Sequence, residues 1–174
     1  MLIMGFAVTS LDGCLTRHDE PGTSFASPED HRFFRAALQT FDSVLAGRKT
    51  YEASRASPLW TRSDSRLRVI LTSSPERFAG DTRPGELEFR DASVEDTAAD
   101  LKRRGRERCA LLGGARLFTD AVRANLLDEL WVTIEPLAFG EGARMFEGRV
   151  DFRFVLASTE PLSANTLLLK YRRA

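Results

Sequence analysis

Short apolar runs alternate with longer amphipathic segments along most of the chain, and this alternation predicts the secondary structure. Apolar runs that are bounded by glycine, proline or polar turns are typical of buried strands. The first run, residues 1–10, is too short to span a bilayer and carries no basic leader, so we predict a core strand there. The predicted strands cover residues 2–8, 43–46, 67–72, 86–90, 109–112, 128–135, 152–156 and 167–171.

Two helices are predicted by the residues at which they begin. Ser27 suits an N-cap, Pro28 suits the first helical position, and acidic residues follow in the first turn. Ser93 begins a second helix, through Leu101, in the same way, and further helices are predicted from Lys49 and over residues 115–124. The first helix has an apolar stripe, expected to face the core, made of Phe33, Phe34, Ala37, Leu38 and Phe41.

Strands alternate with helices in the first three quarters of the chain, and strands alone follow. This order predicts an α/β fold with a mixed, mostly parallel central sheet flanked by helices. The last two strands flank a turn at residues 161–165 and are expected to form an antiparallel pair. No repeat or long linker interrupts the pattern, so we expect one domain over residues 1–174.

Charge and cysteine content narrow the classes of function. Lysine and arginine together number 25, as do aspartate and glutamate, and this balance argues against a nucleic-acid or membrane-surface binder. Cys14 and Cys109 are the only cysteines and lack metal-ligand spacing, so we expect neither a disulfide nor a metal site, and we expect a cytoplasmic protein. The basic run at 103–106 is expected to be a solvated helix end.

Three predicted strands end in turns that suit an anion. These turns are Gly47-Arg48-Lys49-Thr50, Thr72-Ser73-Ser74 and Gly113-Gly114-Ala115-Arg116. Each alone is also compatible with an ordinary strand-ending turn, but together they favour one phosphate-rich ligand lying across one sheet edge. The missing third glycine of GxGxxG disfavours a standard dinucleotide-binding domain.

The same turns carry a resemblance to a known family. Gly47-Arg48-Lys49-Thr50-Tyr51-Glu52, Leu71-Thr72-Ser73 and Gly113-Gly114-Ala115-Arg116-Leu117-Phe118 resemble motifs of the dihydrofolate reductase-like superfamily, over residues 2–146. Within it, Ser10-Leu11-Asp12-Gly13 and Ser27-Pro28-Glu29-Asp30 resemble the reductase domain of bacterial riboflavin biosynthesis, and 127–130, 136–142 and 145–146 agree with this.

The resemblance implies hydride transfer from NADPH. Arg48 with Thr72 and Ser73 would then recognise the 2′-phosphate that distinguishes NADPH from NADH, and the glycine pair would hold the pyrophosphate. The expected cofactor-binding residues are Ala7, Gly13, Gly47, Arg48, Lys49, Thr50, Leu71, Thr72, Ser73, Gly113, Gly114, Ala115, Arg116 and Leu117.

The residues that would bind substrate are less well defined by the sequence. Asp30 stands where folate enzymes present an acid, but as the third residue of a capped helix it is more readily explained by capping. No proton donor is assigned. The candidate substrate-binding residues are Asp12, Asp30, His31, Thr133 and Glu135, and the candidates for a second cationic site are Arg17, Arg55, Arg62 and Arg66.

The expected function is therefore NADPH-dependent reduction of a pyrimidine- or pteridine-like heterocycle, first of all the riboflavin-type 5-amino-6-ribosylaminouracil 5′-phosphate. A dihydrofolate reductase proper and a non-catalytic nucleotide-binding module remain alternatives. The His-x-Glu and Pro-Cys-x-x-Cys motifs of a zinc deaminase are absent, so a stand-alone reductase is expected. A homodimer that pairs through residues 152–156 and 167–171 is expected. Trp60 and Trp131 can each lie in the core, in a pocket or at an interface.

Overall fold

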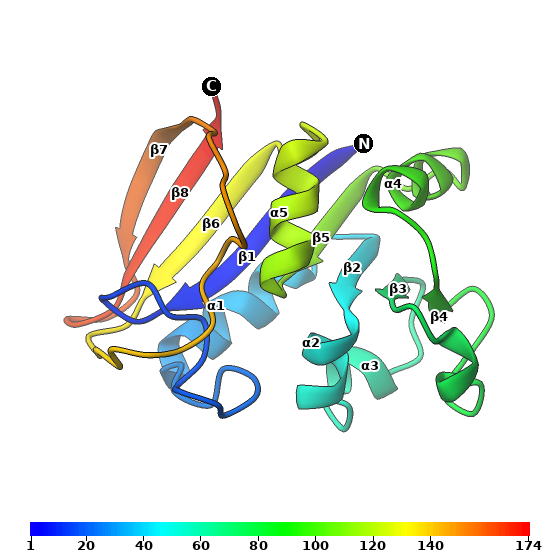
Figure 1. Ribbon diagram of the computed structural model, residues 1–174, viewed down its shortest axis with the longest axis horizontal. Helices are drawn as coiled ribbons and strands as arrows, with labels where there is room; N and C mark the ends of the chain where they lie inside the picture. Colours follow the sequence, from blue (N-terminus) through cyan, green and yellow to red (C-terminus); the bar gives the residue numbers. More distant parts are fainter.

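A computed structural model describes residues 1–174, and its strands and helices follow the alternating α/β order that the sequence predicts. Its eight strands form one mixed sheet in the order β4-β3-β2-β5-β1-β6-β8-β7 (Figure 1). The strands from β4 to β6 are parallel, and β8 runs antiparallel to both β6 and β7. The strands are β1 Leu2–Thr9, β2 Ser43–Gly47, β3 Leu67–Leu71, β4 Leu87–Arg90, β5 Arg108–Leu112, β6 Glu129–Ile134, β7 Phe154–Pro161 and β8 Leu167–Arg173.

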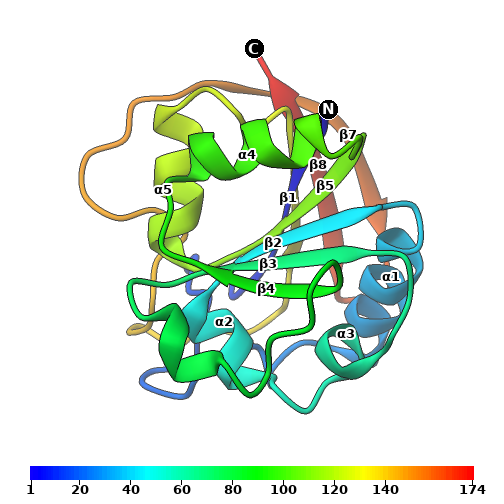
Figure 2. The same cartoon turned by 90° about the vertical axis from the view of Figure 1, so that its right-hand side faces the viewer.

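Helices cover both faces of the sheet, and this explains the continuous apolar runs of the central strands. Figure 2 shows α4 and α5 on one face and α1, α2 and α3 on the other. Along β2, Val44 packs toward the face of α1 and Leu45 toward the face of α4 and α5. The helices are α1 Pro28–Leu38, α2 Arg48–Ala53, α3 Pro58–Thr61, α4 Val94–Arg103 and α5 Ala115–Arg123, with a 3₁₀ helix at Pro75–Phe78.

The predicted serine caps are confirmed. The side chain of Ser27 accepts a hydrogen bond from the amide of Asp30, and that of Ser93 accepts one from Asp96. Ser57 caps α3 in the same way. The sequence pattern did not predict this short helix, because four residues carry no periodicity.

Three expectations need correction. The last hairpin begins at Phe154 and continues to Pro161, because backbone pairing with β8 extends through polar residues that an apolar pattern does not detect. In α1, Leu38 is buried, but Phe33 and Phe34 are only half-buried and line a cleft, where the core had been expected.

The third expectation, a solvated basic run at the end of α4, is met in part. Arg103, Arg104 and Gly105 are exposed, and Arg106 is half-buried. Arg104 donates to both carboxylate oxygens of Glu88 at 2.9 and 2.8 Å, and Arg106 donates to the carbonyl groups of Asp42 and Ser65. The run therefore joins α4 and the loop after it to the neighbouring strands.

Both cysteines are buried and unpaired. No cluster of three histidine, cysteine or acidic side chains has the arrangement of a metal site. None of the helices combines the length and the apolar character that crossing a bilayer requires.

Candidate functional site

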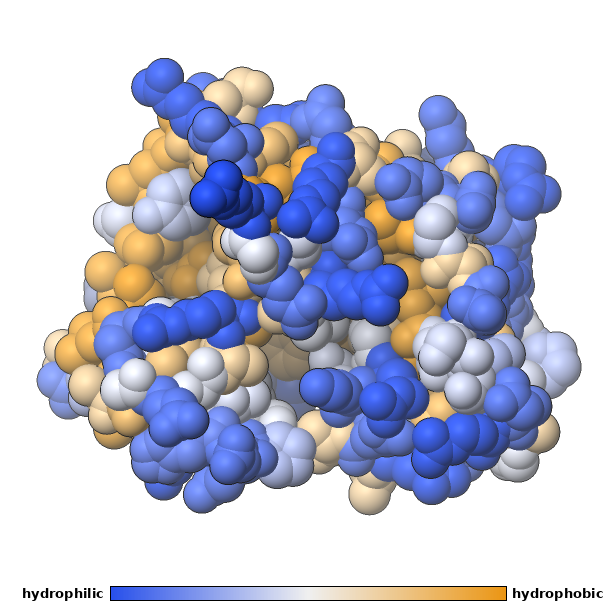
Figure 3. All heavy atoms as spheres, viewed as in Figure 1, coloured by the Kyte–Doolittle hydropathy of each residue, from blue (hydrophilic) through white to orange (hydrophobic).

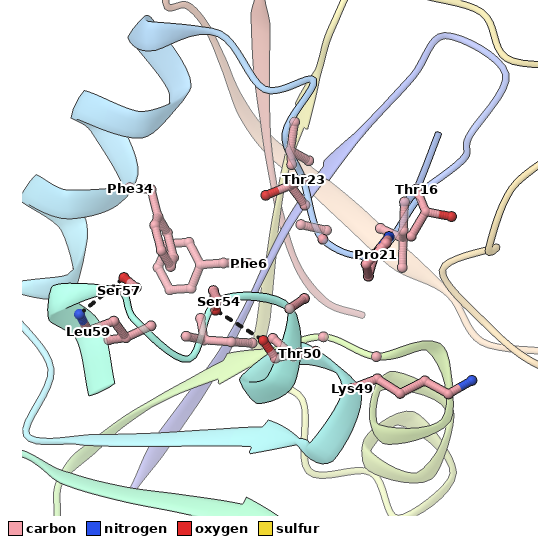
Figure 4. A pocket seen from close by; sticks show the side chains of 18 of the residues that line it. Phe6, Thr16, Pro21, Thr23, Phe34, Lys49, Thr50, Ser54, Ser57 and Leu59 are labelled. Atoms are coloured by element: carbon pink, nitrogen blue, oxygen red, sulfur yellow. Dashed lines mark hydrogen bonds between the residues drawn. The ribbon is translucent and has the colours of Figure 1, made fainter. Parts of the chain in front are cut away.

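One large cleft, of about 1300 Å³, lies at the carboxyl ends of the parallel strands. In Figure 3 the surface is hollowed near the centre of the view. The starts of α2 and α5 line one side, and α1 with the loop between β1 and α1 lines the other. Figure 4 shows this arrangement, with Lys49 and Thr50 on α2 across from Thr16, Pro21 and Thr23 of that loop.

The helices α2 and α5 begin without a side-chain cap, unlike α1, α3 and α4. Their N-cap residues are Gly47 and Gly114, and neither makes a side-chain cap hydrogen bond. The amides of Ala115, Arg116 and Leu117 donate no hydrogen bond within the protein. Since β2 and β5 are adjacent, two open helix starts stand side by side at the cleft, and both can receive an anion.

Glycine is required where these starts meet. Gly113 and Gly114 have φ of +39° and +34°, a region that side chains with a Cβ atom disfavour. The amide of Gly47 donates to the carbonyl oxygen of Gly113 at 3.3 Å. The two predicted glycine turns are thus joined directly by a backbone hydrogen bond.

The remaining predicted cofactor residues divide into cleft-lining and peripheral ones. Ala7, Lys49, Thr50 and Ala115 line the cleft, with the Lys49 side chain extended away from its aromatic end (Figure 4). Arg48 does not line the cleft itself, but it pairs at 2.5 Å with Glu52, which does.

The turn after β3 lies at the same sheet edge, because Leu71 pairs with Gly47. The Thr72 side chain is buried and accepts the amide of Ser74 at 3.2 Å, whereas Ser73 is exposed. This turn is next to the cleft and does not line it.

On α5, two predicted residues do not direct their side chains into the cleft. Arg116 is largely exposed and lies 3.6 Å from Asp120, and Leu117 packs in the core. Only the backbone amides of these residues are available at the helix start.

Asp30 is the buried acid of the cleft. Its amide is capped by Ser27, but its carboxyl group takes no part in capping, because Glu135 binds the Ser27 amide instead. The preference for a capping role is therefore wrong for this side chain. Burial raises the pKa of Asp30, and ionised Glu135 adds to the rise, while the Thr133 hydroxyl and His31 act in the opposite direction.

Thr133 and His31 also line the cleft, beside Asp30. Thr133 is fully buried on β6 and faces α1, so its hydroxyl and the Asp30 carboxyl form one polar spot. Glu135, two residues further along, does not line the cleft, since both of its oxygens bind elsewhere in the protein.

Asp12 likewise makes its hydrogen bonds within the protein. Its carboxylate accepts the amides of Phe139 and Gly140, and the hydroxyl of Ser10. The Ser10 hydroxyl and these amides lower the pKa of Asp12 to about 2. Gly13 follows with φ of +79°, in a tight turn. The pair fixes the loop after β6 against the loop after β1.

The four arginines proposed for a second cationic site separate clearly. Arg55 pairs with Asp81, and Arg17 lies over the ring of Phe139, outside the cleft lining. Arg62 and Arg66 line the end of the cleft, together with Asp64. Arg66 is 3.9 Å from Asp64, and burial lowers the pKa of Arg66, with Arg68 and Arg62 adding to this.

Sequence reasoning missed the aromatic wall of the cleft. The Phe6 ring meets those of Phe34 and Trp131 edge-to-face, at 5.7 and 5.5 Å, and Phe33 stacks on Trp131. The helical stripe of α1 indicated these phenylalanines, but they were assigned to the core. Trp131 and Trp60 both line the cleft, and Trp60 is almost fully buried and donates a hydrogen bond to Ser54.

The chain matches a family model described as the RibD C-terminal domain, over residues 1–168. Uncharacterized protein YwjB of Bacillus subtilis is 26% identical over 145 residues, which are 81% of this chain and 80% of that protein. Dihydrofolate reductase of the same organism is 30% identical over 135 residues, which are 76% of this chain and 69% of that protein.

Among solved structures, a diaminohydroxyphosphoribosylaminopyrimidine deaminase/5-amino-6-(5-phosphoribosylamino)uracil reductase from Thermotoga maritima aligns with a TM-score of 0.79 and 18% identity. The alignment covers 99% of this chain and 56% of that protein. At this identity the likeness establishes the fold.

Proposed function

Because the chain belongs to the family of the RibD C-terminal domain, within the dihydrofolate reductase-like superfamily, we propose that it is an NADPH-dependent reductase of a pyrimidine- or pteridine-like heterocycle. Hydride transfer needs no protein nucleophile, since the cofactor supplies the hydride and the protein fixes donor and acceptor.

The observation that carries this proposal is the composition of the cleft. Two helix starts with free amides face it from adjacent strands, and the buried acid Asp30 lines the same cleft from the other side. The half with the helix starts can bind the phosphates of a dinucleotide. The half with one acid and aromatic rings suits a flat ring that forms hydrogen bonds.

The residues present fit NADPH on the first of these halves. The free amides of α5 suit the pyrophosphate, and Thr50 and Lys49 lie beside it on α2. Arg48 and the exposed hydroxyl of Ser73 are available for the 2′-phosphate at the same sheet edge. We assign the pyrophosphate to the glycine turn and the 2′-phosphate to these side chains.

On the other half, the Asp30 carboxyl would accept hydrogen bonds from ring N–H groups of the heterocycle, and Thr133 would hold that carboxyl in place. The riboflavin-type substrate also carries a phosphate. Arg62 and Arg66 are the candidates for it, because both line the cleft. Asp64 lies beside them in the lining, but this single carboxylate is shared between Arg66 and the buried Arg68.

A second candidate substrate, dihydrofolate, is favoured by Asp30. The sequence favoured a capping role for this acid without excluding contact with a polar ring, and its buried, cleft-lining carboxyl suits hydrogen bonds from a pteridine ring. The wall of Phe6, Phe34 and Trp131 also suits a substrate with an aromatic extension.

The test is substrate-dependent oxidation of NADPH by the purified chain, followed by the loss of the absorbance of the reduced nicotinamide. 5-Amino-6-ribosylaminouracil 5′-phosphate and dihydrofolate are compared at equal concentration, each with NADPH and with NADH. Turnover of either with NADPH supports the reductase. If the cofactor binds but neither substrate is turned over, the non-catalytic nucleotide-binding alternative remains.

A further inference from the structure

One arginine is fully buried on the face of the sheet that carries α3 (Figure 2). The side chain of Arg68 on β3 has no exposed surface, and its partners on the two neighbouring strands are the apolar residues Val44 and Leu87. Removing a guanidinium group from water is costly even when it is paired, and an apolar side chain would often pack here at lower cost. The contacts of Arg68 therefore indicate a role beyond packing.

All the side-chain contacts of Arg68 are with residues 59–66, a segment that comprises most of α3 and the loop after it. The Nε atom donates to the carbonyl oxygen of Leu59, Nη1 to that of Arg66 at 2.8 Å, and Nη2 to the Asp64 carboxylate at 2.8 Å. This segment lines one end of the cleft. A buried cation thus holds that end of the cleft from behind.

Arg68 shares its carboxylate with Arg66. One oxygen of Asp64 accepts both the Arg68 side chain and the backbone amide of Arg66, the latter at 2.9 Å. The other oxygen lies 3.9 Å from Nη1 of Arg66, which is beyond hydrogen-bond distance. The Nε atom of Arg66 donates to the carbonyl oxygen of Phe41, so its two Nη groups are left for a ligand in the cleft.

We propose that Arg68 is a positioning residue that selects for an anionic substrate: by binding Asp64, it keeps that carboxylate from neutralising Arg66. The proposal rests on the proposed function, in which Arg66 is a candidate for binding the substrate phosphate. Without Arg68, Arg66 would be the one cation paired with Asp64, and rotation of the Asp64 side chain would close the gap between them. This ion pair would compete with the phosphate.

The experiment separates the charge of Arg68 from its hold on the loop. Arg68→Met removes the buried cation, and Arg68→Met combined with Asp64→Asn removes the competing carboxylate as well. Arg83→Met is the matched control. Arg83 also donates to a backbone carbonyl of the same segment, that of Trp60, but it pairs with Glu86 and not with Asp64.

Two quantities are measured for each folded variant. Binding of ribose 5-phosphate, with ribose as the control ligand, is followed by NMR titration of the chain without cofactor. The KM and kcat for 5-amino-6-ribosylaminouracil 5′-phosphate are measured with saturating NADPH. The titration needs no turnover, so a chain without reductase activity refutes the proposed function while the effect of Arg68 on phosphate binding is still measured.

We expect Arg68→Met to weaken ribose 5-phosphate binding and to raise KM by roughly 10-fold, the order of one charge-assisted hydrogen bond, with little change in kcat. The double variant is expected to regain most of this loss, because no carboxylate is left to pair with Arg66. Arg83→Met is expected to bind like the wild type. A double variant as weak as Arg68→Met, or an equal loss in Arg83→Met, would mean that Arg68 only holds the loop and would overturn the proposal.

If Arg68→Met does not fold, two other measurements decide. In the wild type, ribose 5-phosphate must shift the guanidinium ¹⁵N resonances of Arg66 and leave those of Arg68 in place. Asp64→Asn, which keeps an acceptor for Arg68, must bind ribose 5-phosphate at least as tightly as the wild type. Unmoved Arg66 resonances, equal shifts of Arg68, or weaker binding by Asp64→Asn each refute the proposal.

Discussion

At the scale of single residues, Asp30 illustrates how a carboxyl of the candidate site opposes stability. It is buried without a salt bridge, and burial raises its pKa above the ordinary value. A raised pKa means that the folded chain binds the proton more tightly than the unfolded chain. The free energy of unfolding therefore falls as the pH rises from the unfolded value of 3.8 toward the folded one.

Asp30→Asn is expected to be at least as stable as the wild type at neutral pH, because the amide carries no buried charge. Its kcat/KM is expected to fall roughly 10- to 100-fold, because the amide loses a charge-assisted hydrogen bond of about 1.5–3 kcal/mol to the ring N–H groups. Thermal denaturation at pH 7 and steady-state kinetics measure the two effects. An active variant would show that Asp30 does not serve the reaction.

Arg48 provides a second prediction at this scale. If its guanidinium binds the 2′-phosphate, Arg48→Ala loses a charge-assisted hydrogen bond of about 1.5–3 kcal/mol, or roughly 10- to 100-fold in NADPH affinity. NADH affinity is expected to change little. Calorimetric titration with both cofactors measures this, with Arg103→Ala on the exposed end of α4 as the control. Equal losses for both cofactors would contradict the assignment.

At the scale of elements, β4 and α4 are held together by charge. Glu88 accepts hydrogen bonds from Arg104 and Arg90, and Asp100 on α4 also contacts Arg90. The Arg104 guanidinium, with Arg90 in addition, lowers the pKa of Glu88 from 4.5 to about 2. These contacts join an edge strand to the helix that covers it.

The sign of the Glu88 shift predicts acid sensitivity. Since its pKa is lower in the folded chain, its stabilisation is fully present above about pH 4.5 and is lost as the pH falls toward 2. Glu88→Gln is therefore expected to melt below the wild type at pH 7, and the gap should close toward pH 3. Thermal denaturation across this range measures it. A constant gap would mean that hydrogen-bond geometry, not charge, provides the stabilisation.

At the scale of the whole molecule, the two edges of the sheet differ. The β4 edge is short and bears the ion-paired Glu88 and Arg90. The β7 edge is longer and almost fully exposed, and three of the four exposed large apolar residues, Val155, Leu156 and Leu167, lie on β7 and β8. Apolar atoms gather there at the left of Figure 3. Such an edge favours pairing with a second chain.

We propose that this edge forms the homodimer expected from the sequence. Leu156→Glu would then place a charge in the interface and give a monomer in light-scattering chromatography, while the wild type elutes as a dimer. Leu11→Glu, which alters an even more exposed leucine after β1, is the matched control. A monomeric wild type would refute the dimer. Cytoplasmic location, predicted from cysteine usage, stays a prediction.

The sequence by itself determined the order of strands and helices, the serine caps and the glycine turns at the strand ends. These features follow from contacts between near neighbours: Ser27 caps an amide three residues away, and apolar runs reflect burial on both sheet faces. The family motifs fall in the same turns, which lie at one edge of the sheet at or next to the cleft, and their binding of a cofactor stays a prediction.

Only the tertiary structure decided what the polar side chains bind. Asp12 and Glu135 were expected to contact substrate, but they bind amides 127 and 108 residues away in the chain. The same holds for Arg104, which binds Glu88, and for Phe34, which packs against the core as expected but also lines the cleft. A side chain's partners depend on which distant segments the sheet brings beside it, and no local pattern contains that information.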